Sequence, residues 1–321
     1  MNLSYVCQQT VCPTLHFLVD GLCVCCLYLA AYTFCGGLLE LFVLYNILAF
    51  LTQPFTGMLA DKVRDRLYLL LSAVALLSVA CVVVSAMALS DVRQAPLYGG
   101  VLMAMLLGAG NSLFHVWGGK QTVDTLGNDP RALGMFVSTG AFGLAVGVVF
   151  FSWMLMAAML AAIVVLSTVC LLMDRQTAIG TVQHARQAPF KGMTFWITAL
   201  VVMLVLFRSF VSQGFSASVV DGSTGVLLVG LTAMFGKMFG GWLAWLLGMA
   251  RSMLVVLVVL FFCYLAAPSF GGAVLLTGLF AVNCTMPVTL CVANGVLPGR
   301  EGLAFGLLAA ALVPGYLLAI L

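Results

Sequence analysis

Long apolar runs alternate with short polar segments along almost the whole chain. Each run is about 20 residues long, which is the length a helix needs to cross a bilayer. Strict period-2 alternation is absent, so the pattern favours helices over strands. The fold class predicted is an all-α polytopic membrane protein. Eleven helices are expected, near residues 11–35, 38–59, 67–89, 97–118, 131–150, 152–172, 193–214, 223–246, 252–268, 271–294 and 301–321.

The composition supports a membrane protein and excludes several other classes. Hydrophobic residues make up 64% of the chain and charged residues 7%, whereas soluble domains carry about 25% charged residues. The lipid bilayer is therefore an expected partner and nucleic acid is not. Walker, dinucleotide-binding, His-Glu-x-x-His and Gly-x-Ser-x-Gly motifs are absent. We therefore predict no enzyme activity and no cofactor.

The eleven cysteines are predicted to be structural. Most lie inside apolar runs, where cysteine behaves as a small, soft apolar residue. Cys23, Cys25 and Cys26 cannot converge on one ion from a single helix, so no metal site is predicted.

The distribution of Lys and Arg predicts the topology. With a cytoplasmic N-terminus, only Arg93 falls on the outer side, and this asymmetry is typical of a multi-pass protein of the cell inner membrane. The segment 173–192 would then be cytoplasmic. The ten basic residues predicted to be cytoplasmic are Lys62, Arg64, Arg66, Lys120, Arg131, Arg175, Arg186, Lys191, Arg251 and Arg300.

One charged segment, Gly57-Met-Leu-Ala-Asp61-Lys62-Val-Arg64-Asp65-Arg66, joins the second and third runs. It resembles the loop between helices 2 and 3 of the major facilitator superfamily, although Arg64 stands where the family usually has Gly. The resemblance implies two pseudo-symmetric helical bundles and alternating access. It also implies that Gly57, Asp61, Lys62 and Arg66 form a conformational latch. The alternative is that Asp61 only offsets the charge of the loop.

An internal repeat supports the two-bundle expectation. Gly57-Met-Leu-Ala-Asp61 recurs as Gly241-Trp-Leu-Ala-Trp245, and the segment from Pro130 to Phe136 recurs from Pro298 to Phe305. The predicted domains are 1–172 with six helices, a linker 173–192, and 193–321 with five helices. The facilitator family usually has twelve helices, so we expect the twelfth to be missing. Because Trp245 replaces the acid, no equivalent latch is expected in the second half.

Two shorter segments hint at a branch of the family. Gly108-Ala-Gly110-Asn111-Ser112-Leu-Phe114-His115 resembles helix 4 of fosmidomycin-resistance-type facilitators. The glycines from Gly134 to Gly147 faintly resemble helix 5 of drug–proton antiporters, although the Gly-Pro pair is missing. Small residues at these spacings also serve plain helix packing.

Polar residues inside the apolar runs are the candidate site, because such groups are costly in a membrane. His16 and Asp20 share a helix face, as do Asn111 and His115. We expect Asp20 to carry a coupling proton, with His16 and His115 relaying or competing for it. The alternative is a static hydrogen bond between packed helices. The four residues expected to bind substrate are Asn111, Arg208, Gln213 and Asn283.

Arg208 and Lys237 are cations inside the apolar runs, and each has more than one possible role. At about 1.5 Å per residue, Arg208 lies roughly 22 Å from the cytoplasmic end, apart from His115 at roughly 3 Å. Arg208 would bind an anionic substrate group, pair with Asp20 or reach the interface. Lys237 is expected to reach the cytoplasmic face, and the alternative is contact with the substrate.

These observations predict a monomeric secondary active transporter that exchanges a small molecule and protons by alternating access. Proton-coupled efflux is favoured over uptake by symport. The alternative of a different class is a non-transporting membrane subunit completed by a partner.

Overall fold

The computed structural model describes residues 7–34, 37–63, 67–89, 95–177 and 193–320. Within these ranges every regular element is helical, and eleven helices or helix groups are long and apolar enough to cross a membrane. The prediction of an all-α polytopic membrane protein is therefore confirmed.

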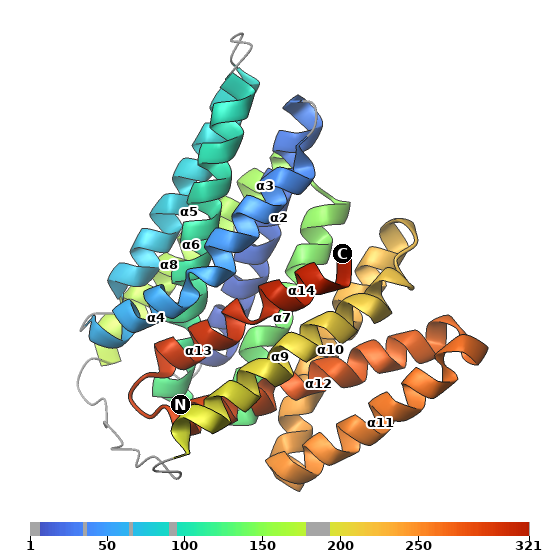
Figure 1. Cartoon of the computed structure of the whole chain (residues 1–321). Coiled ribbons are helices and arrows are strands. Elements are labelled where there is room, and N and C mark those ends of the chain that lie inside the picture. Colours follow the sequence, from blue (N-terminus) through green and yellow to red (C-terminus); the bar gives the residue numbers. More distant parts are fainter. Residues whose placement is uncertain (1–6, 35–36, 64–66, 90–94, 178–192, 321) are drawn as a thin grey trace.

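The helices form two bundles (Figure 1). The first contains η1 (Cys7–Val11), α2 (Cys12–Phe34), α3 (Leu38–Asn46), η2 (Ile47–Leu51), α4 (Gln53–Lys62), α5 (Leu67–Ala88), α6 (Ala95–Leu126), α7 (Pro130–Val149) and α8 (Trp153–Thr177). The second contains α9 (Thr194–Ala217), α10 (Gly222–Leu247), α11 (Met249–Phe270), α12 (Gly272–Val296), α13 (Glu301–Ala310) and α14 (Leu312–Ile320).

Two of the expected spans are interrupted helices. The second span is α3, a π-helical turn (η2) and α4, with Pro54 in the first turn of α4. The last span breaks at Ala311, between α13 and α14. Pro314 follows that break, and its missing N–H removes one hydrogen bond from the helix.

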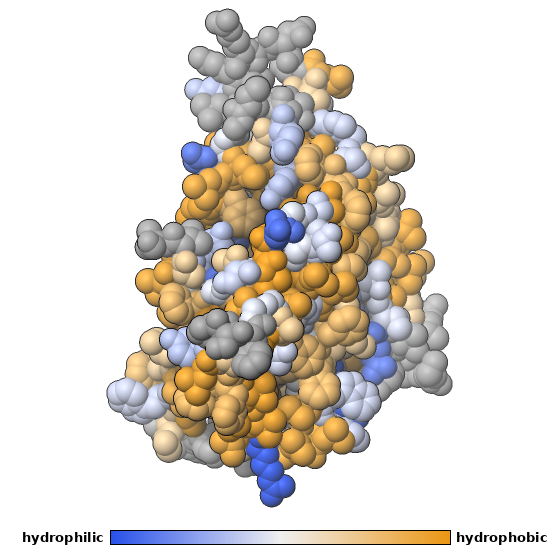
Figure 2. Space-filling model, turned by 90° about the vertical axis from the view of Figure 1, so that its right-hand side faces the viewer, coloured by the Kyte–Doolittle hydropathy of each residue, from blue (hydrophilic) through white to orange (hydrophobic). Residues whose placement is uncertain are grey.

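The two bundles diverge from one end of the molecule, which we call the closed end (Figure 1). At this end α4 packs against α13 and α7 packs along α10. The face seen in Figure 2 is largely apolar. Exposed aromatic side chains of the molecule include Phe195, Trp196 and Tyr264. Such a surface suits contact with lipid tails rather than water.

Helix α6 extends well beyond the expected end at residue 118. It runs to Leu126, so Lys120 lies inside a helix and is buried rather than in a loop. The polar sequence after residue 118 suggested an exit from the membrane, but these residues pack against the second bundle. His115 is thus eleven residues from the helix end, or about 16 Å by the helical rise. The expected depth of about 3 Å was wrong.

The segment expected to be a linker, 173–192, begins inside a helix. Helix α8 extends to Thr177, and residues 178–192 lie outside the described part of the chain. The proposed domain boundaries at 172 and 193 remain a prediction.

Candidate functional site

A buried polar cluster joins α2 and α6 in the middle of the first bundle. It contains His16, Asp20, Asn111 and His115, each at most 6% exposed. Asn111 donates to Asp20 Oδ1 over 2.9 Å. His16 Nε2 lies 3.2 Å from Asp20 Oδ2, and His115 Nε2 lies 3.6 Å from Asp20 Oδ1. The two i, i+4 pairs read from the sequence therefore meet across one helix interface.

Backbone carbonyls fix the tautomers of both histidines. His16 Nδ1 lies 2.6 Å from the carbonyl oxygen of Phe136, and His115 Nδ1 lies 3.0 Å from that of Asn111. A carbonyl oxygen only accepts, so both Nδ1 atoms must carry hydrogen. In the neutral state both Nε2 atoms would then present lone pairs.

Those two Nε2 atoms lie 2.8 Å apart, which is hydrogen-bond distance. Two lone pairs cannot form a hydrogen bond, so the arrangement requires one extra cation between them. A proton shared by the two imidazoles satisfies it, and Asp20 is then the counter-ion of the resulting imidazolium. The geometry is that of a binding site for one proton.

Gly140 on α7 allows this cluster to form. A Cβ atom at that position would lie 2.2 Å from Asp20 Oδ2 and 2.5 Å from His16 Nε2. Any side chain there would displace the carboxylate or the imidazole. Gly140 was read from the sequence only as part of a glycine-rich helix, because the identity of the residue facing it is a property of the tertiary structure.

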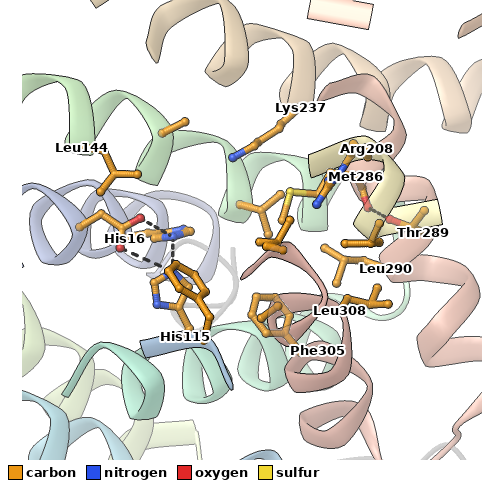
Figure 3. Close-up of a pocket in the computed structure, with 17 residues that line it drawn as sticks. His16, His115, Leu144, Arg208, Lys237, Met286, Thr289, Leu290, Phe305 and Leu308 are labelled. Atoms are coloured by element: carbon orange, nitrogen blue, oxygen red, sulfur yellow. Dashed lines mark hydrogen bonds and ion pairs between the residues drawn. The ribbon is translucent and has the colours of Figure 1, made fainter. Parts of the chain in front are cut away.

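A cavity of about 150 Å³ lies between the two bundles and is partly lined by this cluster. His16, Asp20 and His115 line it from the first bundle, whereas Arg208 and Lys237 line it from the second. Figure 3 shows His16 and His115 on one side of the cavity and the side chains of Arg208 and Lys237 on the other. Most other lining residues are apolar.

The structure brings together some predicted site residues and separates others. Arg208 lines the same cavity as His16 and His115 and does not stand apart from them. Asn111 is fully buried behind Asp20 and acts on the carboxylate, not on the cavity. Asn283 donates to the Leu279 carbonyl of its own helix, and neither it nor the half-buried Gln213 lines the cavity.

Lys237 was expected at the cytoplasmic surface, but it lines the cavity. Its helix packs against α12 through Gly236 and Gly240, where an added Cβ would meet the backbone of Phe280 or Cys284. Glycines on both sides of Lys237 were the available signal, because they show which face of α10 is in tight contact with a neighbouring helix.

The closed end of the molecule carries a second polar cluster. Asp61 on α4 accepts hydrogen bonds from the backbone N–H groups of Gly302 and Leu303, both over 2.9 Å. These groups belong to the first turn of α13, so the carboxylate caps a helix of the other bundle. Lys120 lies 3.1 Å from both Asp61 and Glu301, and it thereby joins α4, α6 and α13.

The other predicted latch residues take different positions. Gly57 packs directly on α13 (see below), whereas Lys62 is exposed at the end of α4. Arg66 and Arg64 lie outside the described residues. Lys120 and Glu301 were not predicted for this cluster. Lys120 was placed in a loop, and Glu301 was placed at a helix start whose neighbours the sequence does not show.

The sequence repeats face each other across the closed end. Gly57 packs on Gly302, where an added Cβ would lie 2.2 Å from the Gly302 carbonyl oxygen. Gly241 packs on Pro130 in the same way, with 2.4 Å between an added Cβ and the carbonyl oxygen. Each repeat of the first motif therefore contacts the opposite repeat of the second motif, as pseudo-two-fold symmetry requires.

The position equivalent to Asp61 has a different contact. Trp245 stacks under Arg131, whose guanidinium carbon lies 4.4 Å from the ring centroid, a cation–π contact. Arg131 also donates to Asp129 over 2.7 Å, and this hydrogen bond holds the pKa of the Asp129 carboxyl below its usual range. The second half thus has a contact between bundles at this place, although it lacks the acid.

We expect Gly57→Ala to weaken the closed end. The new methyl group would overlap the α13 backbone, and overpacking of this kind costs about 1–3 kcal/mol. The bundles should separate there. A cysteine in place of Ala141, which lines the cavity between the bundles, should then be labelled faster by a thiol reagent added from the closed side. Gly295→Ala is the matched control, because its added Cβ has only one atom nearby, at 3.9 Å. Equal labelling of the two variants would contradict the expectation.

Comparison with known proteins gives the fold but no near relative. No family model matches the sequence, and no curated protein matches it. Solved transporters are similar in structure over nearly their whole length. A major facilitator superfamily transporter, FucP, in the outward conformation matches with a TM-score of 0.68 and 12% identity, covering 98% of this chain and 91% of that one.

Two further structures have the same fold. A bacterial homologue of the iron transporter ferroportin, in an outward-facing state, matches with a TM-score of 0.63 and 16% identity, over 97% of this chain and 90% of that one. The nucleoside transporter NupG matches with a TM-score of 0.53 and 12% identity, over 98% and 90%. The protein is therefore a multi-pass membrane protein with the major facilitator fold. The likeness to fosmidomycin-resistance-type and drug–proton antiporters stays a prediction.

Proposed function

We propose that the protein is a major facilitator superfamily transporter that couples movement of a small molecule to movement of protons. The observation that carries this proposal is the cavity between the bundles, with a proton-holding cluster on one wall. The contacts of Asp61, Lys120 and Glu301 close one end of the molecule, and two structures described as outward have the same fold. A transporter that alternates between two sides needs such a closable end.

A proton, rather than a metal ion, is the cation that we assign to the cluster. The ligand-type atoms of His16, Asp20 and His115 all lie within 4.8 Å of one another, which is also a spacing that a metal ion can use. However, Arg208 and Lys237 line the opposite wall of the same cavity. Two fixed positive charges disfavour a divalent cation far more than a single proton.

The roles within the cluster follow from the tautomers. His16 and His115 share the proton, and Asp20 balances its charge. Asn111 orients the carboxylate through its 2.9 Å hydrogen bond. When the bundles rearrange, water reaching the cavity from the other side would take the proton. The sequence assigned the proton to Asp20 itself, and the hydrogen-bond pattern favours the imidazole pair.

Efflux by exchange with protons is the direction that we propose, on the resemblance to drug–proton antiporters. Uptake by symport is the second candidate, supported by the likeness to the E. coli fucose:proton symporter FucP, which has a TM-score of 0.66 and 11% identity over 99% of this chain and 91% of that one. In liposomes, an inward proton gradient should drive substrate out if the protein is an antiporter. The same gradient should drive substrate in if the protein is a symporter.

Access to the cavity from both sides of the membrane distinguishes a transporter from a non-transporting membrane subunit. Ala141 lines the cavity, and a cysteine there, in a background without other accessible cysteines, reports which side is open. A working monomer should be labelled by an impermeant reagent in both right-side-out and inside-out vesicles. Labelling from one side only, together with a partner that co-purifies in fixed ratio, would favour the subunit.

The orientation in the inner membrane is tested separately. We propose that the N-terminus and the closed end are cytoplasmic, because of the Lys and Arg distribution. A cysteine introduced at Gln183, which lies outside the described residues, should react with an impermeant thiol reagent in inside-out vesicles and not in intact cells. The reverse pattern would overturn the orientation.

A further inference from the structure

The second wall of the cavity contains a buried positive charge for which the described residues supply no ion-pair partner. Arg208 is 7% exposed, and its Nη1 atom is buried with no hydrogen-bond acceptor. A guanidinium stays charged in any protein environment. A buried polar atom without a partner is costly, and more so when it belongs to a charged group inside a membrane. The position calls for an anion that is not part of the described chain.

Neither alternative role for Arg208 fits the structure. Asp20, the candidate internal partner, is occupied by Asn111, His16 and His115. Within the described residues, no carboxylate lies within ion-pair distance of Arg208. The guanidinium does not reach the membrane surface either, because its side chain points into the cavity (Figure 3).

Lys237 doubles the positive charge of this wall. It lines the same cavity from α10, and Figure 3 shows its amine directed into the cavity. Its charge and that of Arg208 repel each other. An anion bound between them would relieve this repulsion and satisfy the guanidinium through charge-assisted hydrogen bonds.

The rest of the cavity is suited to an apolar group. Six apolar residues of the second bundle line it: Val205, Met286, Leu290, Phe305, Leu308 and Leu312. The whole cavity, including the part beside the charged side chains, has a volume of about 150 Å³, and an apolar cavity of about that size holds one benzene molecule. The bound molecule should therefore combine one anionic group with an apolar part no larger than benzene.

We propose that the cavity binds a small amphipathic organic anion, with its charged group on Arg208 and Lys237 and its apolar part between α9, α12 and α13. This inference rests on the proposed transport function and names the substrate class. It places the substrate on the second bundle and the coupled proton on the first, so that each bundle holds one of the two transported species.

Benzenesulfonate is a suitable probe, because it is permanently charged and carries one benzene ring. Benzenesulfonamide is its neutral counterpart of nearly the same shape, and benzyltrimethylammonium is the cation of similar size. Titration calorimetry of the purified full chain should show binding of benzenesulfonate at least ten times tighter than of either other compound. Equal affinity for the three would overturn the proposal.

Arg208→Gln separates a binding role from a structural one. We expect this variant to lose at least tenfold in affinity for benzenesulfonate, while Arg208→Lys keeps part of it. The matched control is Arg251→Gln, which removes an exposed Arg from the start of α11 and should bind as the parent does. Without any anion, Arg208→Gln should melt at the same or a higher temperature, because it removes an unpaired buried charge.

The outcomes distinguish this inference from the transport proposal. If Arg208→Gln binds benzenesulfonate as the parent does, or if it melts lower without anion, the anion site is wrong. Labelling of the cysteine at position 141 from both sides would still support transport in that case. If labelling occurs from one side only while benzenesulfonate binding depends on Arg208, the anion site stands and alternating access is wrong.

Discussion

Asp20→Asn is expected to remove the shared proton from the His16–His115 pair at pH 7 and to uncouple transport from the proton gradient. The carboxylate lies 3.2 Å from His16 Nε2 and 3.6 Å from His115 Nε2. As counter-ion it stabilises the imidazolium by roughly 1.5–3 kcal/mol, the usual contribution of a hydrogen bond to a charged group. An amide supplies no charge, so the variant should hold two neutral imidazoles.

The chain is well suited to a direct measurement of this proton, because it contains only three histidines. The third, His184, lies outside the described residues, and His184→Gln leaves only the pair of interest. Nitrogen NMR of the ¹⁵N-histidine-labelled protein should show one protonated and one neutral ring, or one averaged pair, at pH 7. In Asp20→Asn both rings should be neutral with hydrogen on Nδ1.

A matched control and a functional readout complete the test. Asp221→Asn removes an exposed carboxylate at the start of α10 and should leave the spectrum unchanged. Accessibility of the cysteine at position 141 should respond to pH in the parent and in that control, but not in Asp20→Asn. An unchanged imidazolium signal in Asp20→Asn would remove Asp20 from the coupling mechanism.

Asp61→Asn is expected to open the closed end by about tenfold or more. The carboxylate accepts two backbone hydrogen bonds from α13 and lies 3.1 Å from Lys120. Contacts of this type contribute roughly 1.5–3 kcal/mol. The two hydrogen bonds to α13 exist only while the two bundles touch, whereas the ion pair with Lys120 lies within the first bundle. Loss of the two hydrogen bonds therefore shifts a balanced two-state equilibrium towards the other conformation.

The folded yield should change little in this variant. Lys120 keeps Glu301 at 3.1 Å and Asp124 at 3.7 Å, so the substitution does not isolate the buried ammonium. We expect faster labelling of the cysteine at position 141 from the closed side and slower turnover. If Asp61 only balances loop charge, its effect should be small and should disappear at high salt.

Asp124→Asn provides the matched control for this prediction. It removes the same charge and also a partner of Lys120, but Asp124 and Lys120 belong to the same helix. Their interaction is therefore present in both conformations and should not bias the equilibrium. Equal labelling rates in Asp61→Asn and Asp124→Asn would discard the latch.

The sequence predicted the helices well, because the cost of exposing backbone polar groups to lipid leaves helices as the main option for long apolar runs. It also paired His16 with Asp20 and Asn111 with His115, since helical periodicity alone puts such residues on one face. It singled out Gly57 and Asp61 from the spacing of the motif, although the expected loop was wrong at these residues, which lie inside α4. All three inferences depend only on the order of residues within a single segment of the sequence.

The sequence could not predict where the side chains of Lys120 and Lys237 point. Hydropathy placed Lys120 in a loop and Lys237 at the surface, whereas Lys120 joins two bundles and Lys237 lines the cavity. The rotation of a helix about its axis is set by its neighbours, and here by glycines such as Gly236 and Gly240 that fit closely on α12. That fit is decided only when both helices are in place.

Local order along the chain therefore determined that this protein spans the membrane and which polar residues share a helix face. Only the tertiary structure decided that His16 and His115 both point their unprotonated nitrogens at one place, because their tautomers depend on carbonyls of α6 and α7. It also decided that Arg208 finds no ion-pair partner within the part of the chain that the structure describes, because a buried charge is paired or unpaired according to what other helices bring within hydrogen-bond distance.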